Sequence, residues 1–248
     1  MFHFNFWDIV LICVVAIQAT VLTYTSDPEK KSLILIFPFP FTFATISLGG
    51  LINATNVVGL VNLTIFTSGV WFFHSKLRIN IVFSIAFFAI VYCILGVICA
   101  KILPETDTAF WVSAFVVLLF ALALAFFTPC VKENPYRTDL PVWIKIPVIV
   151  AVVSFLVALK KYLSGFMSVF PMVGVIAAYE GRFMLRSICR QMPLLIICLV
   201  SLMMAAKILL KFTNIYFSLA FGWIIFIVVL RLTGKFLWSQ FCMQKLKN

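Results

Sequence analysis

The chain has 248 residues, of which 64% are hydrophobic and only 11% are Asp, Glu, Lys or Arg. Soluble domains carry about a quarter charged residues, so this composition excludes a water-soluble globular protein and favours a chain that lipid solvates. The net charge of +11 would suit a nucleic-acid-binding protein. However, the basic residues form short clusters between apolar runs rather than one basic patch, so they indicate membrane topology and no nucleic acid is expected as a partner.

Nine apolar runs approach or reach the length of about 20 residues that a helix needs to cross a bilayer. In chain order they cover residues 8–25, 33–52, 55–73, 80–103, 109–128, 142–160, 163–179, 191–210 and 214–234. The first run lacks the basic start and the small-residue cleavage site of a signal peptide, so we expect it to remain as a helix. Gly49-Gly50, followed by Asn53, predicts a turn between the second and third runs. The predicted fold is all-α, a polytopic transmembrane helix bundle of about nine spans.

The distribution of Lys and Arg gives the predicted orientation of this bundle. With nine spans, fourteen of these residues lie on the side of the C-terminus and five on the side of the N-terminus. Cytoplasmic loops carry the excess of positive charge in membrane proteins. We therefore expect the C-terminus in the cytoplasm and the N-terminus outside.

One short pattern occurs twice, as Lys-Lys, an apolar run and a Phe-Pro pair. Lys30-Lys31 precedes Phe39-Pro40, and Lys160-Lys161 precedes Phe170-Pro171. Each copy follows one predicted span and precedes two more, which predicts two four-span repeats (1–105 and 142–248, the latter with a short cytoplasmic tail). The linking helix and loop between them, 106–141, would invert the second repeat, and inverted repeats are common in secondary transporters. Chance is the alternative, because Phe and Lys are abundant here.

Three short motifs in the second half follow a helix that ends in basic residues: Ser164-Gly165, Phe170-Pro171 and Ile176-Ala177-Ala178-Tyr179. With the basic loop and two spans after them, residues 142–236 resemble the GlpM-like family of small four-span bacterial membrane proteins. The first half resembles it only through the repeat. The resemblance implies a bacterial cytoplasmic (inner) membrane and a link to exopolysaccharide production. The family carries a His where this chain has Ala178, so a proton role of that His is not expected.

Polar side chains share one face on the second predicted span and one face on the third, which makes them candidate substrate-binding groups. The candidate residues are Thr42, Thr45, Asn53, Asn56 and Thr64, and Thr67 shares the face of the third span. The two faces could line a path for a polar solute. They could equally join helices through hydrogen bonds, each worth roughly 0.6 kcal/mol in membranes.

Two prolines and one acid complete the candidate site. Pro40 and Pro171 are expected at helix starts, or at the ends of broken helices whose free N–H groups could meet an anion. Glu180 lies near a span end and is the candidate proton-coupling acid, because carboxylates within membranes are usually functional. An interfacial ion pair with Arg182 is the alternative for Glu180.

The eight acids and two His are scattered over short loops, without the convergent set that catalysis or metal binding needs. We therefore expect no enzymatic activity and no cofactor. The predicted function is a transporter-like protein that moves an unidentified small polar or amphiphilic solute, with the lipid bilayer and that solute as partners. The alternative is a non-transporting accessory subunit for exopolysaccharide biosynthesis, packed against an envelope-biosynthesis protein or a second copy of the chain.

Overall fold

The computed structural model describes residues 5–127, 142–158 and 164–243. Within these ranges the regular secondary structure is helical, and no strand is present. The elements in chain order are α1 (Phe6–Tyr24), α2 (Pro28–Ile36), α3 (Phe39–Ser47), α4 (Ala54–Trp71), η1 (Phe72–Lys76), α5 (Ile81–Ile102), α6 (Asp107–Phe127), α7 (Val142–Ala158), η2 (Ser164–Val169), α9 (Met172–Glu180), α10 (Leu185–Arg190), α11 (Met192–Leu209) and α12 (Ile215–Met243). The all-α prediction is confirmed for this part of the chain.

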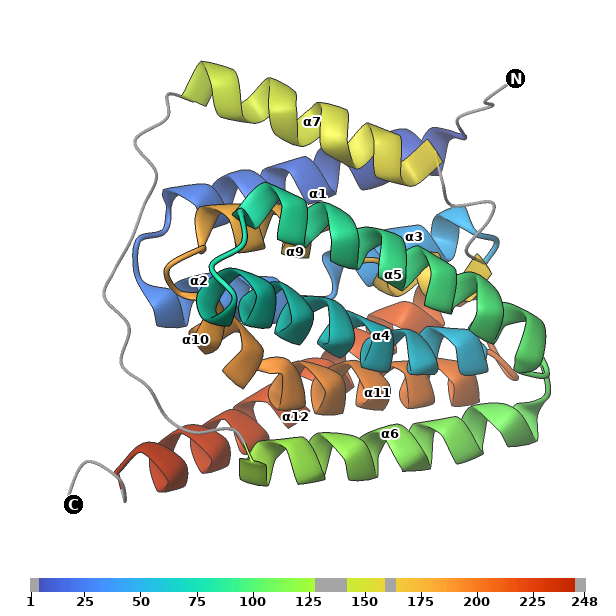
Figure 1. Ribbon diagram of the computed structural model, residues 1–248. Coiled ribbons are helices and arrows are strands. Elements are labelled where there is room, and N and C mark those ends of the chain that lie inside the picture. The colour runs from blue at the N-terminus through green and yellow to red at the C-terminus, as the bar shows by residue number, and fades with distance from the viewer. Residues whose placement is uncertain (1–4, 128–141, 159–163, 244–248) are drawn as a thin grey trace.

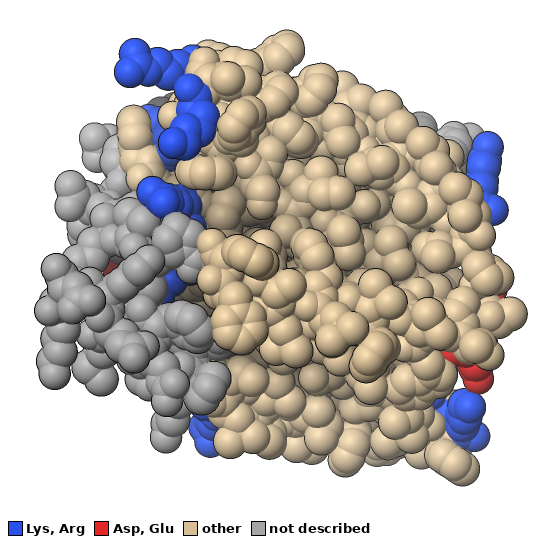
Figure 2. All heavy atoms as spheres, turned by 60° about the horizontal axis from the view of Figure 1, so that its bottom comes forward, with Lys and Arg blue, Asp and Glu red and all other residues tan. Residues whose placement is uncertain are grey.

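Six of the described helices are long and apolar enough to cross a membrane, namely α1, α4 extended by η1, α5, α6, α11 and the first part of α12. Their outward faces carry many exposed Phe, Ile, Leu and Val side chains, as lipid contact requires. On the face drawn in Figure 2, Lys and Arg gather at the two ends of the bundle and leave an uncharged band between them. The chain is therefore a helical, multi-pass membrane protein.

The predicted second and seventh spans, 33–52 and 163–179, are not continuous helices. The second consists of α2 and α3, which are interrupted at Phe37-Pro38. The seventh consists of the 3-10 helix η2 and of α9, which are interrupted at Phe170-Pro171. Proline has no backbone N–H and disfavours helical conformation of the residue before it, so each helix restarts at the proline. Neither apolar run therefore forms a single uninterrupted helix, and the count of nine spans is not confirmed.

The predicted turn between the second and third spans is confirmed. α3 ends at Ser47, and Gly49 and Gly50 follow with φ of +88° and +80°. Glycine adopts this left-handed conformation without the steric cost that a Cβ would add. Asn53 then caps α4, so the chain reverses direction within six residues of the end of α3.

The two interrupted helices lie in the middle of the bundle and pass each other (Figure 1). α3 contacts η2, and α2 contacts α9, so the segment before one break meets the segment after the other. Around them, α1 packs against α7, α4 against α5, and α11 against α12. α6 contacts both α4 and α11. The core of the protein therefore surrounds the two breaks.

Candidate functional site

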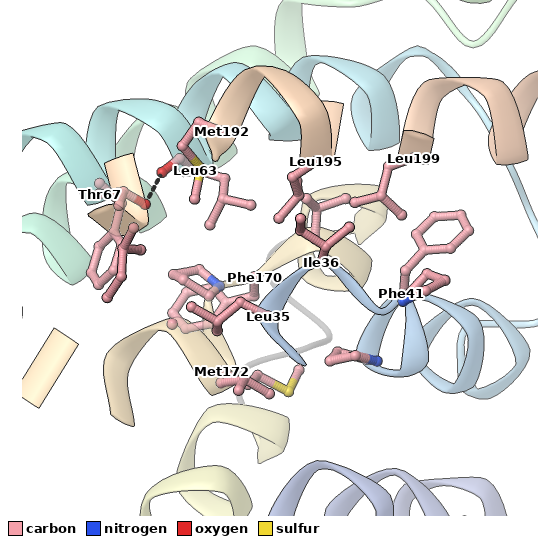
Figure 3. Close-up of a pocket in the computed structure, with 18 of the residues that line it drawn as sticks. Leu35, Ile36, Phe41, Leu63, Thr67, Phe170, Met172, Met192, Leu195 and Leu199 are labelled. Atoms are coloured by element: carbon pink, nitrogen blue, oxygen red, sulfur yellow. Dashed lines mark hydrogen bonds between the residues drawn. The ribbon is translucent and has the colours of Figure 1, made fainter. Parts of the chain in front are cut away.

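A cavity of about 80 Å³ lies where the two interrupted helices pass each other (Figure 3). Phe37 and Pro38 from the first break and Phe170 and Pro171 from the second all line it. Side chains of α4, α10 and α11 close the remaining sides. None of the described residues that line the cavity is charged. The cavity thus combines two helix interruptions with otherwise apolar walls.

Side chains from α1 and α12 hold the first break. Gln18 Nε2 of α1 donates to the carbonyl oxygens of Ile34 (2.7 Å) and Phe37 (3.3 Å) at the end of α2. Trp223 Nε1 of α12 donates to Thr42 Oγ1 at 3.0 Å. An unpaired carbonyl is costly where water is excluded, so Gln18 stabilises the interruption by replacing part of the missing helical bonding.

Side chains from α4 and α5 hold the second break. The Tyr92 hydroxyl of α5 donates to the Phe166 carbonyl at 2.9 Å, and its ring lies 5.0 Å from that of Phe170, centroid to centroid. Asn56 Nδ2 of α4 donates to Ser168 Oγ at 2.7 Å. These two side chains are fully buried or nearly so, as are their partners in η2. The second break is therefore fixed by helices that lie before it in the chain by more than 60 residues.

The five polar side chains that the sequence singled out lie beside the breaks or along α4, but none of them lines the cavity: Thr42, Thr45, Asn53, Asn56 and Thr64. Thr42 and Thr64 donate to carbonyls four residues earlier, at 2.8 and 2.9 Å. Asn53 and Asn56 form the capping box of α4. Thr45 Oγ1 is buried and has no hydrogen-bond partner among the described residues. Most of these polar side chains therefore form hydrogen bonds with the backbone of their own helix or at its start.

Both prolines of the predicted site line the cavity. Pro40 lies in the first turn of α3, and Pro171 is the N-cap of α9. N–H groups in the first turn of a helix have no partner within that helix, and at the second break the Met172 N–H donates instead to the Phe170 carbonyl at 2.7 Å. Glu180, by contrast, is the last residue of α9, is buried, and does not line the cavity. The Arg182 guanidinium lies 5.5 Å from the centroid of the Tyr179 ring.

Four residues that hold the breaks were missed by the sequence analysis: Gln18, Tyr92, Ser168 and Trp223. Gln18 carried a usable signal, because it is a large amide within an apolar run and such a group needs a partner inside a membrane. Tyr92 and Trp223 carried none, because aromatic residues are abundant throughout the chain. The apolar cavity lining also resembles any helix core.

Comparison with known protein families, with curated proteins and with solved structures finds no match to this chain. Within the described residues, no group of three or more His, Cys, Asp and Glu is placed to hold a metal ion. The site therefore has to be interpreted from its own geometry, and the resemblance of residues 142–236 to the GlpM-like family stays a prediction.

Proposed function

We propose that this protein is a transporter-like membrane protein made of two inverted repeats, and that its solute binds between the two interrupted helices. The observation that carries this proposal is the cavity at the crossing of the two breaks. Interrupted helices that meet near the middle of the membrane form the binding sites of many carriers with inverted repeats.

The order and the lengths of the helices support the repeat. α3 and α9 each have nine residues, and each follows a proline N-cap, Pro38 or Pro171. α4 and α11 each have 18 residues. α6 contacts both of these helices, as expected of an element that joins two halves around a pseudo-two-fold axis. In this register the counterpart of Pro171 is Pro38, and not Pro40 as the spacing of the lysines predicts.

The directions of the helices support inversion of the repeat. In Figure 1 the chain runs one way along α1, α4 and α12 and the opposite way along α7, α11 and α5. Every pair of proposed counterparts, α1 with α7, α4 with α11 and α5 with α12, is therefore antiparallel. A two-fold axis within the membrane plane produces this relation, whereas an axis along the membrane normal would leave counterparts parallel.

A short sequence match supports a common register for the fourth helices of the two proposed halves. Asn80-Ile-Val-Phe-Ser84 and Asn214-Ile-Tyr-Phe-Ser218 start α5 and α12. In both, the Ser hydroxyl donates to the Asn carbonyl four residues earlier, at 3.0 and 2.9 Å. Both Asn side chains also accept a backbone N–H of the following turn. These shared details support a duplicated segment rather than chance.

The same register pairs residues that contact the breaks. Tyr92 and Phe226 each lie twelve residues after the Asn that starts their helix. The Tyr92 ring is 5.0 Å from that of Phe170, and the Phe226 ring is 6.2 Å from that of Phe37, centroid to centroid. Phe170 and Phe37 both immediately precede the proline of a break. Each fourth helix thus contacts the interrupted helix of the other half.

Of the two solute classes that the sequence analysis left open, the cavity favours the amphiphilic one. A wholly polar solute would lose its hydration in this cavity without regaining hydrogen bonds, because the lining is almost entirely apolar. An amphiphile can place its apolar part there. Counting α7 and the two interrupted helices as crossings, the proposal has nine spans, with the N-terminus outside and the C-terminus in the cytoplasm of a bacterial inner membrane.

One observation favours the alternative, an accessory subunit for exopolysaccharide biosynthesis that transports nothing. The polar residues expected to bind a solute are largely satisfied within helices: Thr42, Thr64 and the Asn53–Asn56 capping box. In a packing subunit such groups only stabilise the bundle. A measurement of solute flux distinguishes the two functions, because only a carrier transports the solute.

The experiment is transport of fluorescent single-chain and two-chain amphiphiles across proteoliposomes, followed by quenching with an impermeant reductant. Pro38→Ala and Pro171→Ala, which allow the interrupted helices to become continuous, are expected to lower flux at least tenfold. Pro193→Ala is the matched control, because Pro193 starts α11 without lining the cavity. Equal flux in all three variants would contradict the proposed site. Absence of any flux, together with a co-purifying envelope protein, would favour the accessory function.

A further inference from the structure

The walls of the cavity determine which part of a ligand it can hold. Figure 3 shows Leu63, Leu195, Leu199 and Met192 directed into it from α4 and α11. The hydroxyl of Thr67, which also lines it, donates to the Leu63 carbonyl of its own helix at 2.8 Å. Because an ion or a sugar would stay unsolvated there, a hydrocarbon is the chemistry that fits.

The size of the cavity limits the length of that hydrocarbon. An engineered apolar cavity of about 150 Å³ takes up benzene, which has six carbon atoms. A volume of about 80 Å³ therefore holds roughly three carbon atoms of an alkyl chain, by the same ratio. The cavity accommodates a segment of a chain rather than a whole lipid tail.

A short helix, α10, carries cavity-lining residues on one face and arginines on another. Leu185 and Ile188 of α10 line the cavity, and the same helix carries Arg186 and Arg190. Residues 181–191 contain three arginines, and the buried carboxylate of Glu180 directly precedes them. The Arg186 guanidinium lies 6.0 Å from the centroid of the Trp71 ring at the end of α4. Guanidinium groups bind phosphate and carboxylate groups in two-point contacts.

We propose that the cavity and the arginines of α10 form one site for an anionic amphiphile. A segment of its alkyl chain lies in the cavity, and its phosphate or carboxylate head group lies at Arg186 and Arg190. The head group is needed for selectivity, because lipid tails are as apolar as leucine and burial of a chain alone gives no preference over the bilayer. This inference rests on the proposed function only for its place in transport, and binding can be measured without flux.

The test is photoaffinity labelling with dodecyl phosphate that carries a diazirine at the chain end, using the full chain in phosphatidylcholine nanodiscs. We expect labelled peptides from α9 to α11. Leu195→Phe, which fills the cavity, is expected to lower labelling at least fivefold. Leu194→Phe is its matched control, because Leu194 is the adjacent buried residue and does not line the cavity. Leu199→Phe repeats the test if Leu195→Phe does not fold.

The head group is tested in the same assay. The double variant Arg186→Gln, Arg190→Gln is expected to lower labelling at least fivefold, while Lys101→Gln in the last turn of α5 leaves it unchanged. A dodecyl trimethylammonium probe is expected to label at least fivefold less than the phosphate. Displacement by phosphatidylglycerol would identify a membrane lipid as the source of the ligand, and displacement only by single-chain phosphates would identify a free amphiphile; both support the site.

Two results would overturn the inference: equal labelling by the cationic probe, or equal labelling of the Leu195→Phe and Leu194→Phe variants. Labelling as expected but without flux leaves this site in place and removes the carrier function. If flux depends on Pro38 and Pro171 but labelling depends neither on the alkyl chain nor on the head group, the carrier function stands and this binding site is overturned.

Discussion

The hydrogen bond between Asn56 and Ser168 joins α4 to η2 across 112 residues of sequence, and both side chains are buried. Asn56 has a second role, because its Oδ1 accepts the backbone N–H of Asn53 at 2.7 Å in the capping box of α4. Ser168→Ala removes the bond between the two halves, whereas Asn56→Leu removes that bond and the bond to the Asn53 N–H together. We therefore expect Asn56→Leu to be the more destabilising change.

The magnitudes follow from the two kinds of bond. Hydrogen bonds between helices in membranes contribute about 0.6 kcal/mol on average, so Ser168→Ala should cost about that much. Loss of the hydrogen bond to the Asn53 N–H costs about 1 kcal/mol, so Asn56→Leu should cost about 1.6 kcal/mol. Because Ser168 takes no part in the cap, the coupling energy of the double-mutant cycle should be about 0.6 kcal/mol, the bond between the halves alone.

The measurement is unfolding by sodium dodecyl sulfate in mixed micelles, followed by tryptophan fluorescence. Ser201→Ala is a matched control, since the Ser201 hydroxyl donates to the Ile197 carbonyl within α11 and joins no other helix. It should change the free energy of unfolding less than Ser168→Ala does. A coupling energy near zero, or equal destabilisation by Ser168→Ala and Asn56→Leu, would refute the assignment of these two roles.

Three further outcomes are expected in the same unfolding assay. Gln18→Leu should cost about 1–3 kcal/mol, because two carbonyls at the end of α2 lose their donor in the apolar interior; a cost near zero would mean that water replaces it. Gly49→Ala should cost about 1 kcal/mol, because the residue has a positive φ. Gly50→Ala should cost more, because its φ is also positive and its Cβ would lie 3.1 Å from a side chain of α12. A larger loss of stability for Gly49→Ala than for Gly50→Ala would contradict this. Asp107→Asn should leave the midpoint unchanged within error, because its two lysine partners meet it at the exposed end of the bundle.

The long helices could be predicted from the sequence because their signal is local composition. The run 80–103 became α5 (Ile81–Ile102), and the run 191–210 became α11 (Met192–Leu209). The interruptions could not be predicted in the same way, since hydropathy stays high through Phe37-Pro38 and Phe170-Pro171. Hydropathy reports which residues prefer lipid or a core, and it contains no information on where the backbone hydrogen bonds stop.

The candidate site was less predictable than the fold. A Thr on a helix can donate to the carbonyl four residues earlier, as Thr64 does to Leu60 at 2.9 Å. A face of Thr and Asn therefore does not require a solute. The cavity, in turn, is lined by residues such as Leu195 and Met192, which have the same sequence pattern as any buried helix face. Pro40 and Pro171 were predicted as part of the site and do line the cavity, as does Thr67 from the polar face of the third predicted span.

The two breaks differ in how their carbonyls are satisfied, although the proposed repeat makes them equivalent. At the first break the donor to the carbonyls is Gln18 of α1, and at the second break it is Tyr92 of α5. Phe226, the counterpart of Tyr92, retains the ring contact at the first break but has no hydroxyl to donate. At the end of α2 the carbonyls of Ile34 and Phe37 accept from Gln18 instead. The backbone arrangement is thus shared between the halves, while each break depends on a different side chain, so substitutions at Gln18 and Tyr92 should affect one break each.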